Sequence, residues 1–272
     1  MSGWRLVLKA APALRVDLRG ITPAALGGLS AAAVERLPVG HGNAHAALAE
    51  FFYVGAGGAD GTLDFEGDLS RFDRIGWQMA EGRIRVEGHV GHHAGGGMRG
   101  GDLWVEGHAG LLAASEMTGG TFTVEGNVGD HAAGALPGSM DGMRGGTLVV
   151  KGNAGARFAD RMRRGTALVH GTAGDFLASR MVAGTVAVGA GVGAHPGFGM
   201  RRGSLVLAPG AAMPAMPPTF VHAGGDVPVF WQLLARELAR HGGPFAALAG
   251  RRIARHLGDL AADGRGEIIQ VM

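Results

Sequence analysis

The sequence predicts an all-β solenoid, a single-stranded parallel β-helix of about seven to eight 19-residue rungs, with an N-terminal α/β cap and C-terminal helices. One observation behind this is a methionine column that recurs every 19 residues apart from one seven-residue insertion. The other is the strand-like alternation of apolar and polar residues in each repeat. A unit of 19 residues is too short for a helix pair or a four-stranded propeller blade. The column consists of Met79, Met98, Met117, Met143, Met162, Met181 and Met200.

Glycines are predicted to form the corners of the rungs. The chain has 52 glycines in 272 residues, and their fixed positions indicate order rather than low complexity. Corners need a positive φ angle or close backbone approach. Parallel strands lie about 4.8 Å apart and their connections are right-handed, so eight rungs predict a right-handed rod on the order of 40 Å long. One structural glycine column is Gly91, Gly110, Gly129, Gly155, Gly174 and Gly193.

Two apolar columns are expected to fill the interior of this rod. The first is Leu63, Ile84, Leu103, Phe122, Leu148, Ala167, Val186 and Leu205. The second is Phe65, Val86, Val105, Val124, Val150, Val169, Val188 and Leu207. An outward column also becomes apolar in the later repeats, at Val149, Leu168, Ala187 and Val206. Either the helices after residue 226 or a partner protein must cover that side.

The chain is expected to divide into an N-terminal cap (1–57), the β-helix repeats (58–210) and a linker with a C-terminal helical segment (211–272). In the cap, residues 4–9 and 15–18 have the pattern of strands. Thr22 with Pro23 opens a short helix and Ser30 caps another.

The two ends of the rod need covering because open strand edges expose unpaired backbone groups. Helical spacing over 226–241 and 244–257 predicts two helices at the C-terminal end. The insertion between Ala133 and Met143 predicts a surface loop that leaves the rungs undisturbed. This loop is either a contact site for another protein or a tolerated insertion without a role.

Composition excludes several classes of function. The sequence has no cysteine, which excludes disulfides, iron–sulfur ligation and cysteine zinc sites. It has neither a signal-peptide pattern nor an apolar run of membrane-spanning length, so we expect a cytoplasmic protein without a membrane partner. Net charge is +2, and two of the 25 basic residues are lysines, an imbalance typical of a GC-rich bacterial genome rather than of a nucleic-acid binder.

No catalytic or metal site can be assembled from the sequence. His89 and His108 share a repeat position with Asn127 and Asn153, which favours polar side chains bonding to backbone over a metal site. The methionines are better explained as flexible core residues than as a copper site. The glycines of residues 189–195 resemble a dinucleotide fingerprint, but no helix follows them.

Two charged columns are predicted on the surface. Stacked glutamates are unfavourable unless solvent screens them or a basic partner neutralises them; they are Glu66, Glu87, Glu106 and Glu125. Arginines that follow the methionine column form a stripe, either a solvated edge or a site for a polyanion. The stripe is Arg99, Arg144, Arg163 and Arg201. With 6% aromatic residues, stacking on nucleic-acid bases is not favoured.

Residues 88–101 resemble the GxxGxxxGxxMxGG repeat of the C subunit of the formylmethanofuran dehydrogenase family. The lead-in segments 21–24 and 35–43 and the phenylalanine pair that follows also resemble that family, so the likeness covers about residues 20–208. Archaeal members of the family reduce carbon dioxide on other subunits. The bacterial relatives form a formyltransferase/hydrolase complex, which moves a formyl group from formyl-tetrahydromethanopterin to methylofuran and releases formate. The arginine bias favours the bacterial kind.

This resemblance implies a non-catalytic scaffold that joins an amidohydrolase-like A subunit, a degenerate B subunit and a formyltransferase D subunit. No catalytic residue is carried over from the family, because its motif residues are structural glycines and methionine. Methylofuran-type cofactors have polyglutamate tails, so the resemblance also implies a hypothesis that Arg99, Arg144, Arg163 and Arg201 bind that tail.

Other functions remain open from the sequence. The chain is alternatively the C subunit of a true formylmethanofuran dehydrogenase or a structural β-helix like that of glutamate synthase. Two further alternatives are an autonomous β-helical enzyme, as in polysaccharide lyases, and a free-standing interaction protein. Copurification with three further subunits would separate the complex from the last two.

Overall fold

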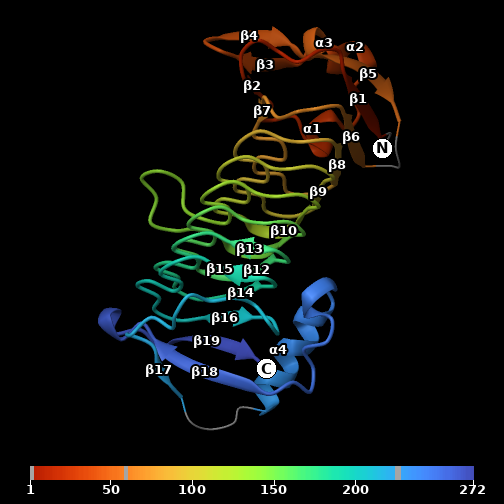
Figure 1. The fold of residues 1–272 in the computed structure, drawn as a ribbon. Helices are drawn as coiled ribbons and strands as arrows, with labels where there is room; N and C mark the ends of the chain where they lie inside the picture. Colours follow the sequence, from red (N-terminus) through yellow and green to blue (C-terminus); the bar gives the residue numbers. More distant parts are fainter. Residues whose placement is uncertain (1–2, 58–60, 224–227) are drawn as a thin grey trace.

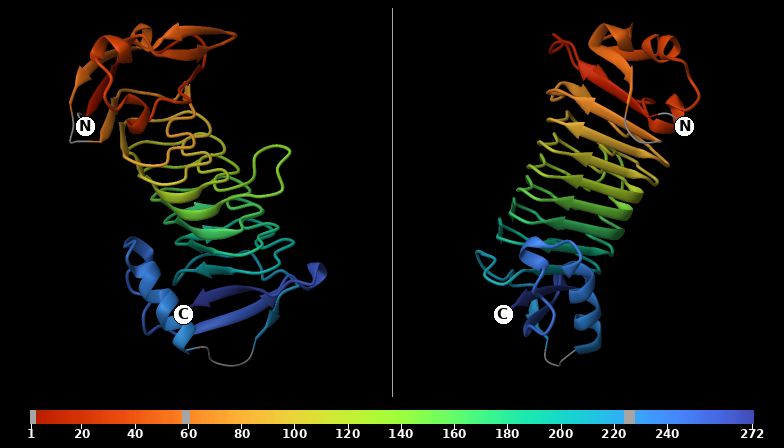
Figure 2. Two further views of the ribbon diagram at one scale, coloured as in Figure 1. Left: turned by 180° about the vertical axis from the view of Figure 1, so that it is seen from behind. Right: turned by 90° about the vertical axis from the view of Figure 1, so that its right-hand side faces the viewer.

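The structure, a computed structural model, describes residues 3–57, 61–223 and 228–272 and is elongated (Figure 1). Its main element is a 13-stranded sheet that runs along most of the molecule. The central strands are β6 (Thr62–Glu66), β8 (Arg83–Glu87), β9 (Asp102–Val105), β10 (Thr118–Val124), β11 (Arg144–Val150), β12 (Arg164–Val169), β14 (Thr185–Val188) and β16 (Ser204–Leu207). Each central strand and the loop after it form one layer, and the layers stack along the molecule (Figure 2).

The prediction of a single-stranded parallel β-helix is wrong, because the long sheet is mixed. At one end, β1 (Trp4–Leu8) pairs in parallel with β6 but antiparallel with β5 (Phe52–Ala56). At the other end, β19 (Gly266–Val271) pairs in parallel with β16 but antiparallel with β18 (Ile253–Gly258), which pairs antiparallel with β17 (Val221–His222). The terminal segments lie outside the 19-residue period. The period therefore could not show that they join the same sheet as strands that cover its edges.

Within the central strands, equivalent positions of successive layers lie opposite one another. Leu63 is opposite Ile84, which is opposite Leu103, and Phe122 is opposite both Leu103 and Leu148. All residues of the two predicted inward columns are buried, which confirms the alternation read from the sequence. The insertion after Ala133 does not change this register, because it leaves the stack as a loop between β10 and β11.

Left-handed backbone conformations occur at three non-adjacent positions in most loops. In the loop after β9, Leu112, Ala114 and Glu116 have φ angles of 60°, 55° and 54°. The middle position is buried and small in every layer, because the loop folds back on the core there. Non-glycine residues in this conformation are uncommon, and sequence reasoning expected positive φ at glycines alone.

A different constraint applies to the column of structural glycines that begins at Gly91. Gly91 has no positive φ, but a Cβ there would collide with the carbonyl oxygen of Phe72 and the carboxylate of Asp73. Gly110, Gly129 and Gly155 meet the backbone of the preceding layer in the same way. Close approach between layers therefore requires glycine in this column.

Three strands of the N-terminal segment and one short strand of the first layer form a second, four-stranded sheet (Figure 1). Its strands are β2 (Val16–Asp17), β3 (Pro38–His41), β4 (Ala44–Ala47) and β7 (Phe72–Asp73), and the helices are α1 (Pro23–Leu26), α2 (Ala31–Glu35) and α3 (Leu48–Phe51). The hydroxyls of Thr22 and Ser30 accept hydrogen bonds from the backbone N–H groups of Ala25 and Ala33, each at 3.3 Å. Both predicted helix caps are confirmed, whereas β3, β4 and α3 were not expected.

The described residues of the C-terminal segment contain one α-helix, α4 (Pro228–Ala239), rather than two. The helix predicted over 226–241 is confirmed from Pro228, while residues 226 and 227 lie outside the described residues. The helix predicted over 244–257 is wrong. That range holds part of the 3₁₀ turn η1 (Gly243–Phe245) and most of β18, and a second turn, η2 (Leu260–Ala262), leads into β19. The unpaired edge of β16 requires strand partners, and this requirement overrides helical spacing.

Helix α4 packs against the side of the stack that becomes apolar in the later layers. Val149, Leu168, Ala187 and Val206 form one buried cluster with residues of α4 and η1. The residues of α4 and η1 in this cluster are Trp231, Ala235, Leu238 and Phe245. Of the two predicted covers for this face, a C-terminal helix is therefore the one that the structure contains.

Candidate functional site

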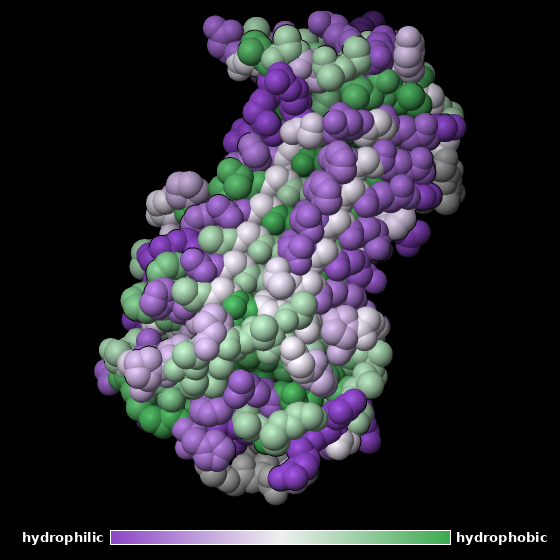
Figure 3. Space-filling model, in the orientation of Figure 1, coloured by the Kyte–Doolittle hydropathy of each residue, from purple (hydrophilic) through white to green (hydrophobic). Residues whose placement is uncertain are grey.

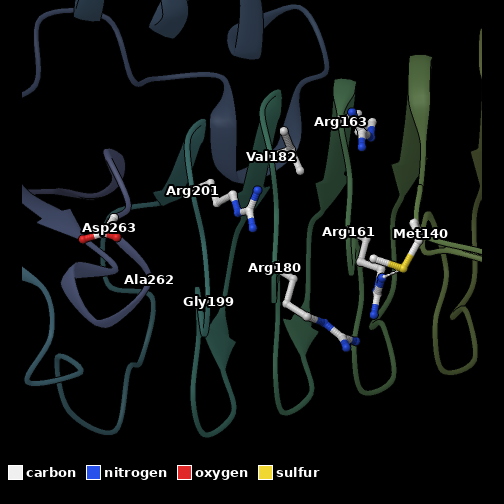
Figure 4. Close-up of a pocket in the computed structure, with 9 residues that line it drawn as sticks. All are labelled: Met140, Arg161, Arg163, Arg180, Val182, Gly199, Arg201, Ala262 and Asp263. Carbon is white, nitrogen blue, oxygen red and sulfur yellow. Dashed lines mark hydrogen bonds between the residues drawn. The ribbon is translucent and has the colours of Figure 1, made fainter.

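Several arginine side chains converge along the loop edge of the later layers. One cavity of about 450 Å³ is lined by Met140, Arg161, Arg163, Arg180, Val182, Gly199, Arg201, Ala262 and Asp263 (Figure 4). A second cavity of about 370 Å³ is lined by Arg144, Arg163, Arg164, Val182, Ala183 and Arg202. The two cavities share Arg163 and Val182 and therefore adjoin, and we call the two together the arginine groove.

Buried and loop carboxylates hold some of these arginines in place. Arg180 donates two hydrogen bonds to Asp160, at 3.0 and 2.6 Å, and the hydroxyl of Ser179 donates to the same carboxylate at 2.6 Å. Asp160 is 4% exposed, so burial and these donors fix both its position and that of Arg180. Arg163 forms an ion pair with Asp141.

The other arginines of the groove are less fully paired with carboxylates than Arg163 and Arg180 are. Arg144 is 4.0 Å from Glu116, the longest separation of the ion pairs in the groove. Among the residues that the structure describes, Arg164, Arg201 and Arg202 have no carboxylate within ion-pairing distance. The arginine groove therefore has excess positive charge and several guanidinium groups that can donate to a ligand.

The structure brings together three of the four arginines predicted from the sequence. Arg144, Arg163 and Arg201 line the groove, whereas Arg99 is exposed on an earlier layer and lines neither cavity. Arg161 and Arg180 were missed. A signal for them was present, because each directly precedes a methionine of the buried column, at the left-handed position of its loop.

The inserted loop forms one wall of the groove. The Nη1 atom of Arg161 lies 2.8 Å from the sulfur of Met140, and the backbone N–H of Gly142 donates to the carbonyl of Arg161 at 2.9 Å. With the pair between Arg163 and Asp141, these contacts tie the loop to the layer that follows it. This loop therefore has at least one role within the chain, and contact with another protein stays a prediction.

The histidine column is a ladder of side chain to backbone hydrogen bonds. The rings of His89 and His108 are stacked at 4.8 Å and 3°. Nδ1 of His89 accepts from the backbone N–H of His108 at 2.9 Å, and Nδ1 of His108 accepts from that of Asn127 at 2.8 Å. Asn127 and Asn153 accept in the same way from the next layers. The interpretation as polar side chains bonding to backbone is confirmed.

A parallel ladder starts at Asp73, which sequence analysis did not single out. Its carboxylate accepts from the backbone N–H of His92 at 2.7 Å and from the guanidinium of Arg15. Burial alone would raise the pKa of Asp73, but these two donors keep it below its ordinary value. Asp130 and Asp175 accept backbone N–H groups of later layers at 2.8 Å each. These carboxylates therefore have structural partners.

The glutamate column is neutralised partly within the chain, an outcome that the sequence did not suggest. Arg85 lies 3.3 Å from Glu87 and 2.8 Å from Glu106, and Arg5 pairs with Glu66. Trp104 donates from its indole N–H to Glu125 at 3.1 Å. Hydrophilic residues gather in stripes along the stacked layers (Figure 3).

The polar side chains in the described part of the chain do not form a metal site. Within residues 3–57, 61–223 and 228–272, no group of three or more His, Cys, Asp or Glu side chains is arranged to hold a metal ion. The seven predicted methionines are all buried in the core. None of the helices described combines the length and apolar character needed to cross a bilayer.

Comparison with known proteins provides close relatives. No model of a known protein family matches the chain. The C subunit of the formyltransferase/hydrolase complex Fhc of Methylorubrum extorquens is 46% identical over 77 residues, 28% of this chain and 29% of that protein. The C subunit of molybdenum-containing formylmethanofuran dehydrogenase 1 of Methanosarcina barkeri is 35% identical over 92 residues, 32% of this chain and 31% of that protein. These matches span about three tenths of each relative's length.

A solved structure extends the likeness to the whole chain. A chain in the crystal structure of the Methylorubrum extorquens formyltransferase/hydrolase complex FhcABCD, determined with methylofuran, is 44% identical. It superposes with a TM-score of 0.91 over 98% of both chains. Since the segment match with the same organism is to the C subunit, the chain belongs to the family of C subunits of the formyltransferase/hydrolase complex.

Proposed function

We propose that this chain is the non-catalytic scaffold subunit of a formyltransferase/hydrolase complex. That complex would move a formyl group from formyl-tetrahydromethanopterin to methylofuran and release formate. The observation that carries this proposal is the 44% identity and 98% coverage of both chains with a member of the FhcABCD complex.

The disposition of the polar groups supports a structural rather than a catalytic role. His89, His108 and the buried Asp160 are each engaged in bonds that hold layers or loops together. A general base or nucleophile needs a partner-activated side chain open to a substrate. The histidine and aspartate ladders use such side chains to accept backbone N–H groups instead.

Three partners are proposed: an amidohydrolase-like A subunit, a degenerate B subunit and a formyltransferase D subunit. Affinity purification of the tagged chain from its native host tests this. We expect three further subunits to copurify in stoichiometric amounts. Recovery of the chain as a lone monomer from intact cells would reject the proposed function.

A second candidate is the C subunit of a true formylmethanofuran dehydrogenase, which the 35% identity to the Methanosarcina barkeri protein favours. Metal analysis of the copurified assembly separates the two. Molybdenum or tungsten at stoichiometric amounts would indicate the dehydrogenase, and their absence from an assembly that releases formate would indicate the formyltransferase/hydrolase complex.

Methylofuran is the proposed cofactor of the assembly, supported by its presence in the solved FhcABCD structure. Binding of its acidic tail by Arg99, Arg144, Arg163 and Arg201 stays a hypothesis from the sequence.

The cytoplasmic location also stays a prediction.

A further inference from the structure

Helix α4 is apolar on two opposite faces. Trp231, Ala235 and Leu238 recur at i, i+4 and i+7 and are buried against the stacked layers. On the opposite face, Val229 and Leu233 are 73% and 62% exposed. A surface helix normally has one apolar and one polar face, and a helix that is apolar all round is normally buried. The outer face of α4 therefore has the composition of a contact surface rather than that of a solvated one.

Three large apolar side chains of this outer face are neighbours. Val229 and Leu233 are four residues apart, and Phe230 and Leu233 are three apart, which are the spacings of adjacent side chains on a helix. Phe230 is 42% exposed. Single exposed apolar residues are normal in soluble proteins, whereas a contiguous patch marks an interaction surface. We call these three residues the α4 patch, and Figure 1 shows α4 beside the last layers, at the margin of the molecule.

Basic side chains follow the α4 patch along the same face. Arg236 lies at i+7 from Val229, roughly 10 Å further along the helix, and Arg240 directly follows the helix end. Arg240 pairs with Glu237 at 2.8 Å, but Arg236 has no carboxylate within ion-pairing distance in the part of the chain that the structure describes. The outer face of α4 therefore combines an apolar half with a half that has an unpaired positive charge.

This combination indicates the chemistry of the protein that covers the face. Interfaces place apolar side chains at their centre and complementary charges around them. A second copy of this chain fits poorly. Pairing of two α4 helices over their full length would place Arg236 against the apolar patch when the helices are antiparallel, or against the other copy's Arg236 when they are parallel. A different protein, with apolar side chains and a carboxylate beside them, satisfies both halves.

We infer that the outer face of α4 docks an apolar segment with flanking carboxylates that belongs to the A, B or D subunit of the complex. Val229, Phe230 and Leu233 are the apolar anchors, and Arg236 pairs with a carboxylate of the partner. This inference rests on the proposed function, which supplies the three candidate partners. It adds the surface of this chain at which one of them binds.

The test measures binding of the full 272-residue chain to each of the purified A, B and D subunits by surface plasmon resonance. One of the three is expected to bind. Leu233→Asp is expected to weaken that binding at least about tenfold, because it puts a charge among the apolar anchors. The control is Leu14→Asp, at another apolar position that is 55% exposed, and it is expected to leave the affinity unchanged.

Two neighbouring charges test the sign of the partner's charge. Arg236→Gln is expected to weaken binding roughly three- to tenfold and to make the affinity less dependent on salt. Glu237→Gln removes the internal partner of Arg240 and is not expected to weaken binding. The opposite pattern, a loss with Glu237→Gln and none with Arg236→Gln, would show a basic partner and overturn the inference.

Further outcomes would also overturn it. These are undiminished binding by the Leu233→Asp chain, an equal loss in the Leu14→Asp chain, or a dimer of the single chain in light scattering that Leu233→Asp dissociates. The last result would identify a second copy as the occupant. If the wild-type and Leu233→Asp chains assemble equally well with the three subunits, the inference fails while the proposed function stands. If the wild-type chain binds none of them, both fail.

Discussion

At the scale of single residues, the same atoms that resemble a metal or catalytic cluster hold neighbouring layers together. The Nδ1 atom of His108 accepts the backbone N–H of Asn127, which would otherwise lack a partner at a corner of the stack. Asn127 and Asn153 perform this task in the next layers with a side-chain oxygen. This column therefore requires a side-chain hydrogen-bond acceptor at a fixed distance from the backbone, and an imidazole is not essential.

This account predicts losses of stability of different size for two substitutions at one position. His108→Ala leaves the N–H of Asn127 without its acceptor and is expected to lower the free energy of unfolding by about 1–3 kcal/mol. His108→Asn restores an acceptor and is expected to lose less than half as much. Urea denaturation followed by circular dichroism measures both, and equal losses would contradict the ladder.

The methionine column leads to a second prediction. Met181 is fully buried, whereas Met140 of the inserted loop is 70% exposed. Met181→Ala is expected to cost about 2–5 kcal/mol of unfolding free energy through the cavity it leaves. Met140→Ala serves as the control and should change it little. Similar values for the two variants would show that the column does not contribute to the core.

At the scale of elements, α4 and η1 cover the apolar face of the later layers. The covered face and the two elements together form a second buried cluster. Trp231 is buried, and its indole N–H donates to the carbonyl of Arg251 at 2.9 Å. Trp231→Ala is expected to lower the free energy of unfolding by about 3–5 kcal/mol. Amide hydrogen exchange should accelerate in α4 before it accelerates in the central strands. Val229→Ala, at a position 73% exposed, is the matched control. Uniform acceleration along the chain would contradict a separate cluster.

The contact between η1 and the stacked layers predicts that the stability of the folded protein depends on pH. The ring of His170 packs edge-on against Phe245, with centroids 5.4 Å apart, and its Nε2 atom is buried without a hydrogen-bond partner. Burial lowers the pKa of His170, and the charge of Lys151 lowers it further. His241 also has a pKa lowered by burial.

The folded state disfavours protonation of His170. The contribution of neutral His170 to stability is therefore fully present above the ordinary histidine pKa of about 6.5, and it is lost as pH falls through the lower pKa of the folded state. His170→Phe should therefore flatten the acid side of the stability profile, measured as Tm between neutral and mildly acidic pH. His45→Phe, at an exposed position in β4, provides the comparison. An unchanged acid slope in the His170 variant would contradict the assignment.

The C-terminal elements also show where sequence reasoning succeeds and where it fails. Alternation within the repeats predicted the buried columns, because side-chain direction in a strand follows directly from sequence position. The same reasoning assigned a helix to the segment that forms β18, because a short amphipathic pattern can suit a helix or a strand. Pairing with β19, which no local pattern reveals, decides between them.

At the scale of the whole molecule, stacking determines which residues can act together. Arg161 and Arg180 are separated by 19 residues yet line one cavity, and Asp160 lies within ion-pairing distance of both. The sequence placed arginines in a stripe but could not show that Arg99 lies outside the groove. Met140 of the inserted loop lines the groove, and no repeat pattern specifies the course of that loop.

The elongated stack, with different surfaces at its two ends and along its sides, suits a protein that holds others at fixed positions. The most direct measurement of this role is size-exclusion chromatography of the other complex subunits from cells that lack this chain. The account predicts that the A, B and D subunits then elute separately and that adding the chain back restores one assembly. Elution of those three subunits as a single intact complex without the chain would contradict the scaffold function.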